Sequence, residues 1–191
     1  MKVIYAALPL LISLNSACGA LPNRMGPERI SEADISNGNA IVIVSAGAPS
    51  ACTSTGTNLE FKSEGTRYTG STVAYMPVDF SIVKSDFTDH HGFLHTFKLA
   101  PGNYYMTTSV ANAYVKGIKV PKYDFSVSAG EIIYLGEYYM TVSCVWTPVA
   151  SMRDQEQRDV AILKSKNPAF LNKKITKRIP LMSGYAIGGD Q

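Results

Sequence analysis

The 191-residue chain carries a net charge of +3, with 17% of its residues charged and 46% hydrophobic. This length fits one domain with a sizeable core, and so mild a charge gives no reason to expect nucleic acid as a partner. Eleven Tyr, 15 Gly and 10 Pro favour strands joined by turns over a helical bundle. Beyond the N-terminus, no apolar run reaches the roughly 18 residues of a membrane-spanning helix, so the sequence predicts no internal span.

Residues 1–17 have the organisation of a signal peptide. Lys2 precedes an apolar stretch, Val3–Leu14, which has signal-peptide length and is too short to cross a bilayer. Small residues then lead directly into Cys18, and this arrangement resembles the lipobox of bacterial lipoproteins. In that family the cysteine is lipidated on its thiol and becomes the mature N-terminus. The resemblance therefore implies a palmitate-type lipid anchor at Cys18.

The same resemblance predicts a location in the cell envelope. Gly19, rather than Asp, follows Cys18, which implies the outer membrane, with the domain facing the periplasm. Residues 18–39 are expected to be the lipidated N-terminus that the resemblance implies, followed by a tether, because the stretch contains scattered Pro and Gly and no sustained hydrophobic period. Secretion without lipid, after cleavage near Ala17 or Ala20, is the alternative and would give a soluble periplasmic protein.

The number of cysteines supports the anchored form. Three cysteines is an odd number for an exported protein, and lipid on Cys18 would leave Cys52 and Cys144 as a pair. An oxidising periplasm permits a disulfide between them. Closing a loop of about 90 residues would stabilise the fold by about 4 kcal/mol in the chain-entropy model. The alternative is two separate free thiols.

Residues 40–150 predict a mainly β domain. Ala40–Ser45 is apolar on both faces, as in a strand at the centre of a sheet. Phe93–Leu99 alternates between two faces and places its aromatic residues and His95 on the same face. Further strands are expected at Asn58–Lys62, Arg67–Tyr75 and Val78–Lys84.

Two stretches with tight glycine turns suggest neighbouring hairpins. Leu99–Tyr105 reads Leu-Ala-Pro-Gly-Asn-Tyr-Tyr, and Phe125–Gly136 carries Ala-Gly-Glu before an aliphatic strand. The pattern resembles that of small bacterial lipoproteins with a transthyretin-like or carboxypeptidase-regulatory-like β-sandwich. The resemblance covers about a quarter of the chain and implies an antiparallel β-sandwich in the cell envelope. That family brings no catalytic residues to this sequence.

Residues 151–191 predict a short helical appendage and a basic tail. Ser151–Lys166 has a capping residue and a short apolar side, and Asn167-Pro168 would end this helix. Apolar residues at intervals of four before Pro180 predict a second short helix, and the chain from Gly184 to its end reads as frayed. The basic residues of this tail are Lys173, Lys174, Lys177 and Arg178. They would contact anionic headgroups or an acidic partner, or simply form a solvated helix face.

One cluster of residues suits a metal ion. Asp86, Asp89, His90, His91 and His95 lie within ten residues, and carboxylates and imidazoles are transition-metal ligands. The spacing differs from the H-E-x-x-H pattern of zinc proteases. The alternative interpretation is a polar loop followed by one half-buried histidine on a strand.

These observations favour a binding or structural role over catalysis. The chain has neither a Gly-x-Ser-x-Gly elbow nor a phosphate-binding glycine loop, so we expect no enzymatic activity and no cofactor. The first hypothesis is a non-enzymatic cell-envelope lipoprotein that acts as a structural or interaction module, anchored in a membrane and in contact with an envelope protein. The second is a soluble periplasmic metal- or ligand-binding protein that uses His90, His91 and His95.

Overall fold

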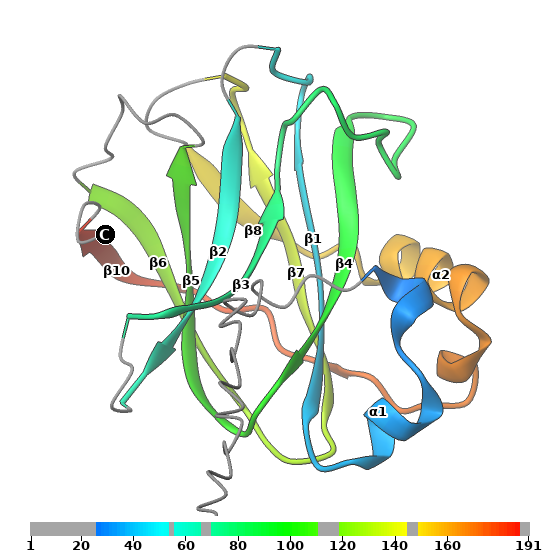
Figure 1. The fold of residues 1–191 in the computed structure, drawn as a ribbon. Helices are drawn as coiled ribbons and strands as arrows, with labels where there is room; N and C mark the ends of the chain where they lie inside the picture. The colour runs from blue at the N-terminus through cyan, green and yellow to red at the C-terminus, as the bar shows by residue number, and fades with distance from the viewer. Residues whose placement is uncertain (1–25, 54–55, 66–69, 111–118, 145–148, 188–191) are drawn as a thin grey trace, which may run out of the picture.

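Two β-sheets packed face to face form the body of the protein (Figure 1). The computed structural model describes residues 26–53, 56–65, 70–110, 119–144 and 149–187. The first sheet has the order β4 (His91–Leu99), β1 (Ala40–Ala48), β7 (Ile132–Met140), β8 (Ala150–Arg153), with β9 (Thr176–Lys177) also beside β7. The second has the order β10 (Met182–Ile187), β6 (Lys119–Val127), β5 (Gly102–Val110), β2 (Thr57–Glu64), β3 (Thr72–Pro77). The predicted mainly β sandwich with a short C-terminal helix is confirmed.

Strand β1 is the centre of the first sheet, as its sequence predicts. It pairs with β4 on one side and β7 on the other, and all nine of its residues are buried. Its pairing with β7 is parallel, so this sheet is mixed rather than purely antiparallel. Alternate side chains such as Val42 and Val44 enter the core between the sheets, while Ile41 and Ile43 face outward.

The core between the sheets is built from aromatic and aliphatic side chains of both. Phe61 of β2 meets Phe97 of β4 across the sandwich at 4.7 Å between ring centroids, and it meets Phe125 of β6, in its own sheet, at 6.2 Å. Tyr123 of β6 meets Tyr138 of β7 edge to face at 6.0 Å. Offset and tilted contacts of this kind are the preferred geometry of aromatic pairs.

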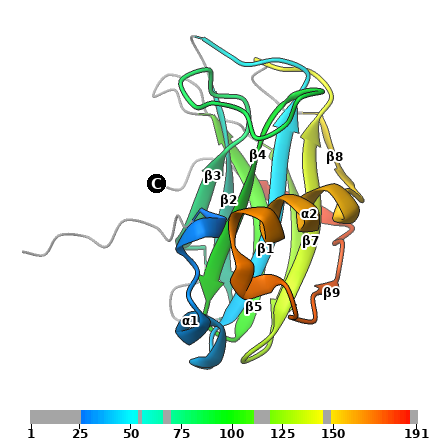
Figure 2. The same ribbon diagram turned by 90° about the vertical axis from the view of Figure 1, so that its right-hand side faces the viewer.

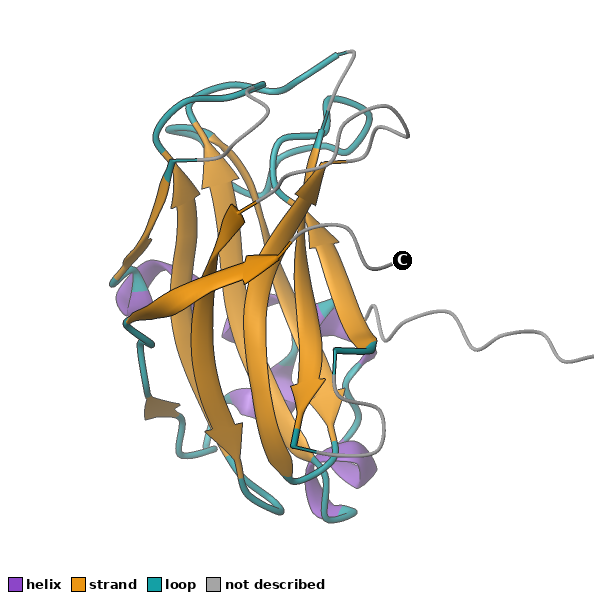
Figure 3. Ribbon diagram, turned by 90° about the vertical axis from the view of Figure 1, so that its left-hand side faces the viewer, coloured by secondary structure: helices purple, strands orange, loops and turns teal. Residues whose placement is uncertain are grey.

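A helical layer covers the outer face of the first sheet. Helix α2 (Glu156–Lys166) crosses in front of β4, β1 and β7 in Figure 2, and in Figure 3 the helices lie behind the strands. Leu163 of α2 and Phe170 of the 3-10 turn η2 (Pro168–Phe170) are fully buried there against Ile41, Ile43 and Tyr134. We call this second apolar cluster the outer core. Because β1 is apolar on both faces, it can lie at the centre of its sheet only where the outer core covers the face that points away from the other sheet.

The predicted hairpins are turns between the two sheets, which corrects the expected pairing. The Pro101-Gly102 turn joins β4 of the first sheet to β5 of the second, and the turn at Gly130 joins β6 of the second to β7 of the first. Turn residues and alternation show where a chain reverses. They do not show whether the two strands hydrogen-bond to each other or to other neighbours.

The expected tether is largely part of the folded domain. Residues 27–36 form the 3-10 turn η1 (Pro27–Arg29) and helix α1 (Glu32–Ser36), and Ile30 and Ile35 are buried in the outer core. Ser31 and Asp34 make a capping box at the start of α1, which is the helical turn the sequence suggests. Asn167 Nδ2 donates to the carbonyls of Pro27 and Ile30 at 2.8 and 2.7 Å, so this segment is fastened to the end of α2.

The C-terminal part differs from its prediction in three places. Residues 150–153 form strand β8, so α2 begins at Glu156 rather than near Ser151. The predicted second helix is wrong, because the chain after η2 runs extended into β9 and β10. The end expected to fray pairs with β6 as far as Ile187.

The strand expected over Val78–Lys84 is also wrong; in this stretch only Phe80 makes a bridge, to Cys52. None of the helices in the described part of the chain has the length and apolar character that a membrane crossing requires.

The outer core predicts that truncating two leucine side chains to alanine will lower the free energy of unfolding by different amounts. Leu163→Ala removes a fully buried side chain, so we expect the free energy of unfolding to fall by about 2–5 kcal/mol. Leu171→Ala changes the same atoms at a position that is 54% exposed and should cost far less. Urea denaturation of both variants measures this difference. Equal losses would contradict the assignment of α2 to a buried layer.

Candidate functional site

The two cysteines of the domain are bonded, which confirms the predicted pair. Cys52 and Cys144 form a disulfide with 5.4 Å between their Cα atoms, and the two positions are 92 apart in sequence. Cys52 is 3% exposed, whereas Cys144 is an exposed residue. The bond joins the segment between β1 and β2 to the segment that follows β7, at one end of the sandwich.

A buried carboxylate lies directly against this disulfide. Asp79 is 0% exposed, and its Oδ2 lies 2.8 Å from Cys52 Sγ. The backbone N–H of Thr57 donates to Asp79 Oδ1 at 2.6 Å, and that of Cys144 donates to Oδ2 at 3.2 Å. The Cys52 N–H donates to the Asp79 carbonyl at 2.5 Å, so one residue ties three loops together. Burial raises the pKa of the Asp79 carboxyl above its ordinary value, although the backbone hydrogen bonds oppose the shift.

The three histidines of the predicted metal site do not converge. His90 contacts Asp89 and Glu137, the His91 Nε2 lies 2.8 Å from the carbonyl oxygen of Phe80, and His95 stacks parallel to the Phe97 ring. His91 and His95 are four residues apart on β4, a separation of about 13 Å along a strand. Across the described residues, only Cys52, Asp79 and Cys144 bring three potential ligand atoms within 4.8 Å. The disulfide uses both sulfur atoms of that group.

A second polar site lies on the outer face of the first sheet, beside α2. We call the residues Ser45, His90, Tyr134, Glu137, Arg153, Arg158 and Asp159 the buried charge cluster. Both of its carboxylates, Glu137 and Asp159, are 0% exposed. Arg158 bridges them, with 3.0 Å from Nη2 to Glu137 Oε1 and 2.8 Å from Nε to Asp159 Oδ1. Ion pairs buried to this extent are costly to desolvate and hold only when hydrogen bonds complete them.

Hydrogen bonds complete the cluster on both carboxylates. Arg153 binds Glu137 Oε2 through Nε at 2.8 Å and also through Nη2, and His90 Nε2 lies 2.7 Å from Oε1. Asp159 Oδ2 accepts from the hydroxyls of Ser45 at 2.5 Å and Tyr134 at 2.8 Å. Burial, with the neighbouring Asp159 carboxylate as a second cause, raises the pKa of the Tyr134 hydroxyl. The arrangement fixes the start of α2 to β1 and β7.

A bulge in β7 explains why alternation along the sequence does not reveal this cluster. Gly136 has φ +93°, and the register of β7 against β1 shifts between Ile43 and Ser45. The shift brings Glu137 to the outer face beside Ser45, where strict alternation would bury it between the sheets. The detectable signal is a lone Glu within an apolar strand, because such a residue needs a partner.

The arginines of the cluster also stack on aromatic rings. The Arg158 guanidinium lies 3.8 Å from the centre of the Phe87 ring, and that of Arg153 lies 3.5 Å from the centre of the Tyr139 ring. Cation–π contacts of this kind stabilise partly desolvated arginines.

The histidine of the cluster depends on a neighbouring glycine. A Cβ atom at position 47 would lie 2.6 Å from the His90 ring, so Gly47 leaves the space that this histidine occupies.

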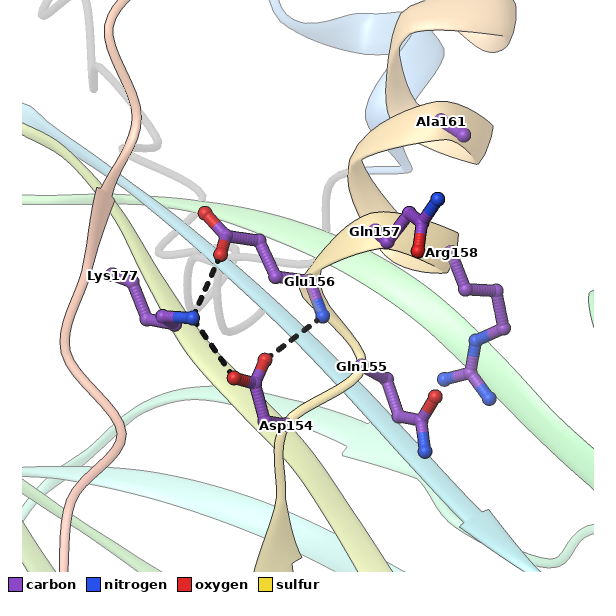
Figure 4. A pocket seen from close by; sticks show the side chains of 7 residues that line it. All are labelled: Asp154, Gln155, Glu156, Gln157, Arg158, Ala161 and Lys177. Carbon is purple, nitrogen blue, oxygen red and sulfur yellow. Dashed lines mark hydrogen bonds and ion pairs between the residues drawn. The ribbon is translucent and has the colours of Figure 1, made fainter.

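An open pocket of about 620 Å³ adjoins the cluster at the start of α2 (Figure 4). Its lining residues are Asp154, Gln155, Glu156, Gln157, Arg158, Ala161 and Lys177. Lys177 Nζ reaches Asp154 at 2.8 Å and Glu156 at 3.0 Å, so the acids of the pocket already have a counter-charge. The pocket is thus polar and nearly neutral.

The basic tail is largely engaged with acids of the same chain. Lys173 pairs with Glu32 at 2.9 Å and Arg178 with Glu131 at 2.6 Å, while Lys174 is exposed. Together with the pairs of Lys177, these contacts fasten the tail across the first sheet. They leave less positive charge for headgroups or an acidic partner than the sequence suggests.

Cys18, the predicted lipidation site, lies outside the residues that the structure describes.

Comparisons of the chain with protein-family models, with curated protein sequences and with solved structures found no match. The candidate sites therefore depend on the geometry above.

The buried charge cluster predicts a large effect of one neutralising substitution. Glu137→Gln leaves Arg153 and Arg158 against an uncharged amide, so we expect the free energy of unfolding to fall by about 2–4 kcal/mol. We expect a smaller loss of stability than for breaking a fully buried ion pair, because the side chains of both arginines are partly exposed. Glu156→Gln, at the exposed Lys177 pair nearby, is the matched control and should cost much less. If chemical denaturation gives equal values for the two variants, the cluster does not hold α2 in place.

Proposed function

We propose that the protein is a non-enzymatic lipoprotein of the cell envelope whose β-sandwich acts as a structural or interaction module. The observation that carries this proposal is the Cys52–Cys144 disulfide. It accounts for two of the three cysteines and leaves Cys18, at the end of the signal-like segment, as the remaining one. A single cysteine at this place is what lipid attachment requires.

The disulfide also supports export from the cytoplasm. Disulfides persist in oxidising compartments and are rare in the cytosol of most organisms. The apolar N-terminal stretch supplies the export signal, and Gly19 after the cysteine favours the outer membrane over the inner one. One acyl chain binds a membrane weakly, so stable anchoring depends on several chains at this N-terminus.

Strand β10 supports a role in binding another envelope protein. It lies at one end of the second sheet, where β6 is its only neighbour among the described strands. Leu181 just before it and Tyr185 within it are 86% and 60% exposed. An edge strand with exposed apolar side chains is a surface on which an extended partner segment adds as a further strand.

Lipid labelling tests the anchor. In cells fed an alkyne analogue of palmitate, the wild-type protein should take up label, fractionate with membranes and have a mature N-terminus at Cys18. Cys18→Ser should lose the label and the membrane association. The double variant Cys52→Ser/Cys144→Ser should keep the label, which separates lipidation from any general effect of losing a cysteine. Label retained on Cys18→Ser, or a wild-type mature chain that begins elsewhere, would refute the anchor.

A further inference from the structure

The disulfide is asymmetric with respect to solvent. Cys52 is 3% exposed and pairs through a backbone bridge with Phe80, next to Asp79, whereas Cys144 is exposed on the loop after β7. A thiolate from solution attacks the sulfur that it can reach along the S–S axis. Attack at Cys144 Sγ makes the buried Cys52 the leaving group.

A hydrogen bond between Asp79 and Cys52 requires a proton on the Asp79 carboxyl, because the disulfide sulfur has none to donate. A disulfide sulfur carries no hydrogen, so a contact of 2.8 Å between Asp79 Oδ2 and Cys52 Sγ is favourable when the carboxyl is protonated and donates. The same carboxyl accepts the N–H groups of Thr57 and Cys144, which hold it in this orientation. A buried acid thus lies against the sulfur that would leave.

We propose that Cys52–Cys144 is an exchange site for low-molecular-weight thiols, in which Asp79 is the proton donor to the leaving Cys52 sulfur. The proposal goes beyond the structural role of the disulfide and does not depend on lipidation at Cys18.

The chemistry balances in two exchange steps. A thiolate attacks Cys144 Sγ, its new S–S bond forms as the Cys52–Cys144 bond breaks, and the Cys52 thiolate takes the proton of Asp79. A second thiolate then attacks the sulfur of the bound thiol and releases Cys144 as a thiolate. Two external thiols are oxidised to one disulfide, and the protein disulfide is reduced by two electrons.

The surrounding contacts allow the bond to open without separating the loops. Asp79 joins the two cysteine segments independently of the S–S bond, because its carbonyl accepts the Cys52 N–H and its carboxyl accepts the Cys144 N–H. The N–H of Ser50 also donates to Ser143 Oγ at 3.0 Å, which connects the same two segments. Exchange is therefore expected in the folded protein.

The buried position of Asp79 sets the direction of the pH dependence. Burial raises the pKa of its carboxyl, while the N–H groups of Thr57 and Cys144 and the charged form of His91, which lies on β4, lower it. The donor is present below this pKa and is lost as the pH rises through it. The rate constant per external thiolate should therefore fall with increasing pH, although the amount of thiolate itself increases.

Mapping of the mixed disulfide in the wild-type protein is the first test. The folded protein is incubated with excess reduced glutathione, quenched with acid and digested, and the adduct is located by mass spectrometry. The expected adduct is on Cys144. An adduct on Cys52, or no reaction until a denaturant is added, would overturn the proposal.

Kinetics of Asp79→Asn provide the second test. General acids contribute about 10²–10⁴-fold to proton-transfer steps, so we expect at least about a tenfold slower reduction, with a rate constant per thiolate independent of pH. Asp154→Asn removes an exposed acid that follows β8 at the end away from the Cys144 loop, so it should retain the wild-type rate and profile. Circular dichroism checks that each variant is folded, and the wild-type pH profile stands without any variant. A flat wild-type profile, or equal rates in wild type and Asp79→Asn, would contradict the role of Asp79.

Discussion

The pairing of β1 between β4 and β7 is the constraint on which the rest of this structure depends. A strand whose nine residues are all buried needs a core on each side of its sheet. The second sheet supplies one core, with Val42 and Val44 facing it. The other requires a layer over Ile41 and Ile43, and the chain builds that layer from both of its ends. Segments that the sequence presents as accessories are therefore part of the domain.

The outer layer is attached by charge as well as by apolar contact. Glu137 and Asp159 lose all contact with solvent, which is unfavourable unless every lone pair finds a donor. Arginines from β8 and α2, a histidine next to β4 and hydroxyls from β1 and β7 provide those donors. Such a network fixes the position of α2 more narrowly than side-chain packing alone, because a shifted helix would leave buried charge unpaired.

The sequence predicts the positions of strands, and the face on which each side chain lies, well where a single hydrophobic pattern determines them. The apolar run at β1 and the alternation at β4 give the correct positions, and the pair that remains when Cys18 is set aside is the pair that is bonded. Where two structures satisfy the same rule, prediction fails. The turns at Pro101 and Gly130 suit a hairpin and an inter-sheet crossing equally, and the structure uses the crossing.

The candidate sites were hidden from the sequence for related reasons. The bulge at Gly136 inverts the alternation of β7, so Glu137 reaches its partners only through a feature that no local pattern reveals. Asp79 lies in a stretch that reads as a strand, and its meeting with both cysteine loops depends on contacts distant in sequence. The histidines illustrate the converse, since closeness in sequence did not bring their ring nitrogens together.

Both the disulfide and the charge cluster lie on a scaffold that the central strand makes rigid. Hydrogen–deuterium exchange read peptide by peptide tests that claim most directly, because amides that open only on global unfolding exchange last. The account predicts that peptides from β1 and β7 exchange most slowly and that the edge strand β10 exchanges much earlier. Exchange of β1 as fast as that of β10 would contradict it.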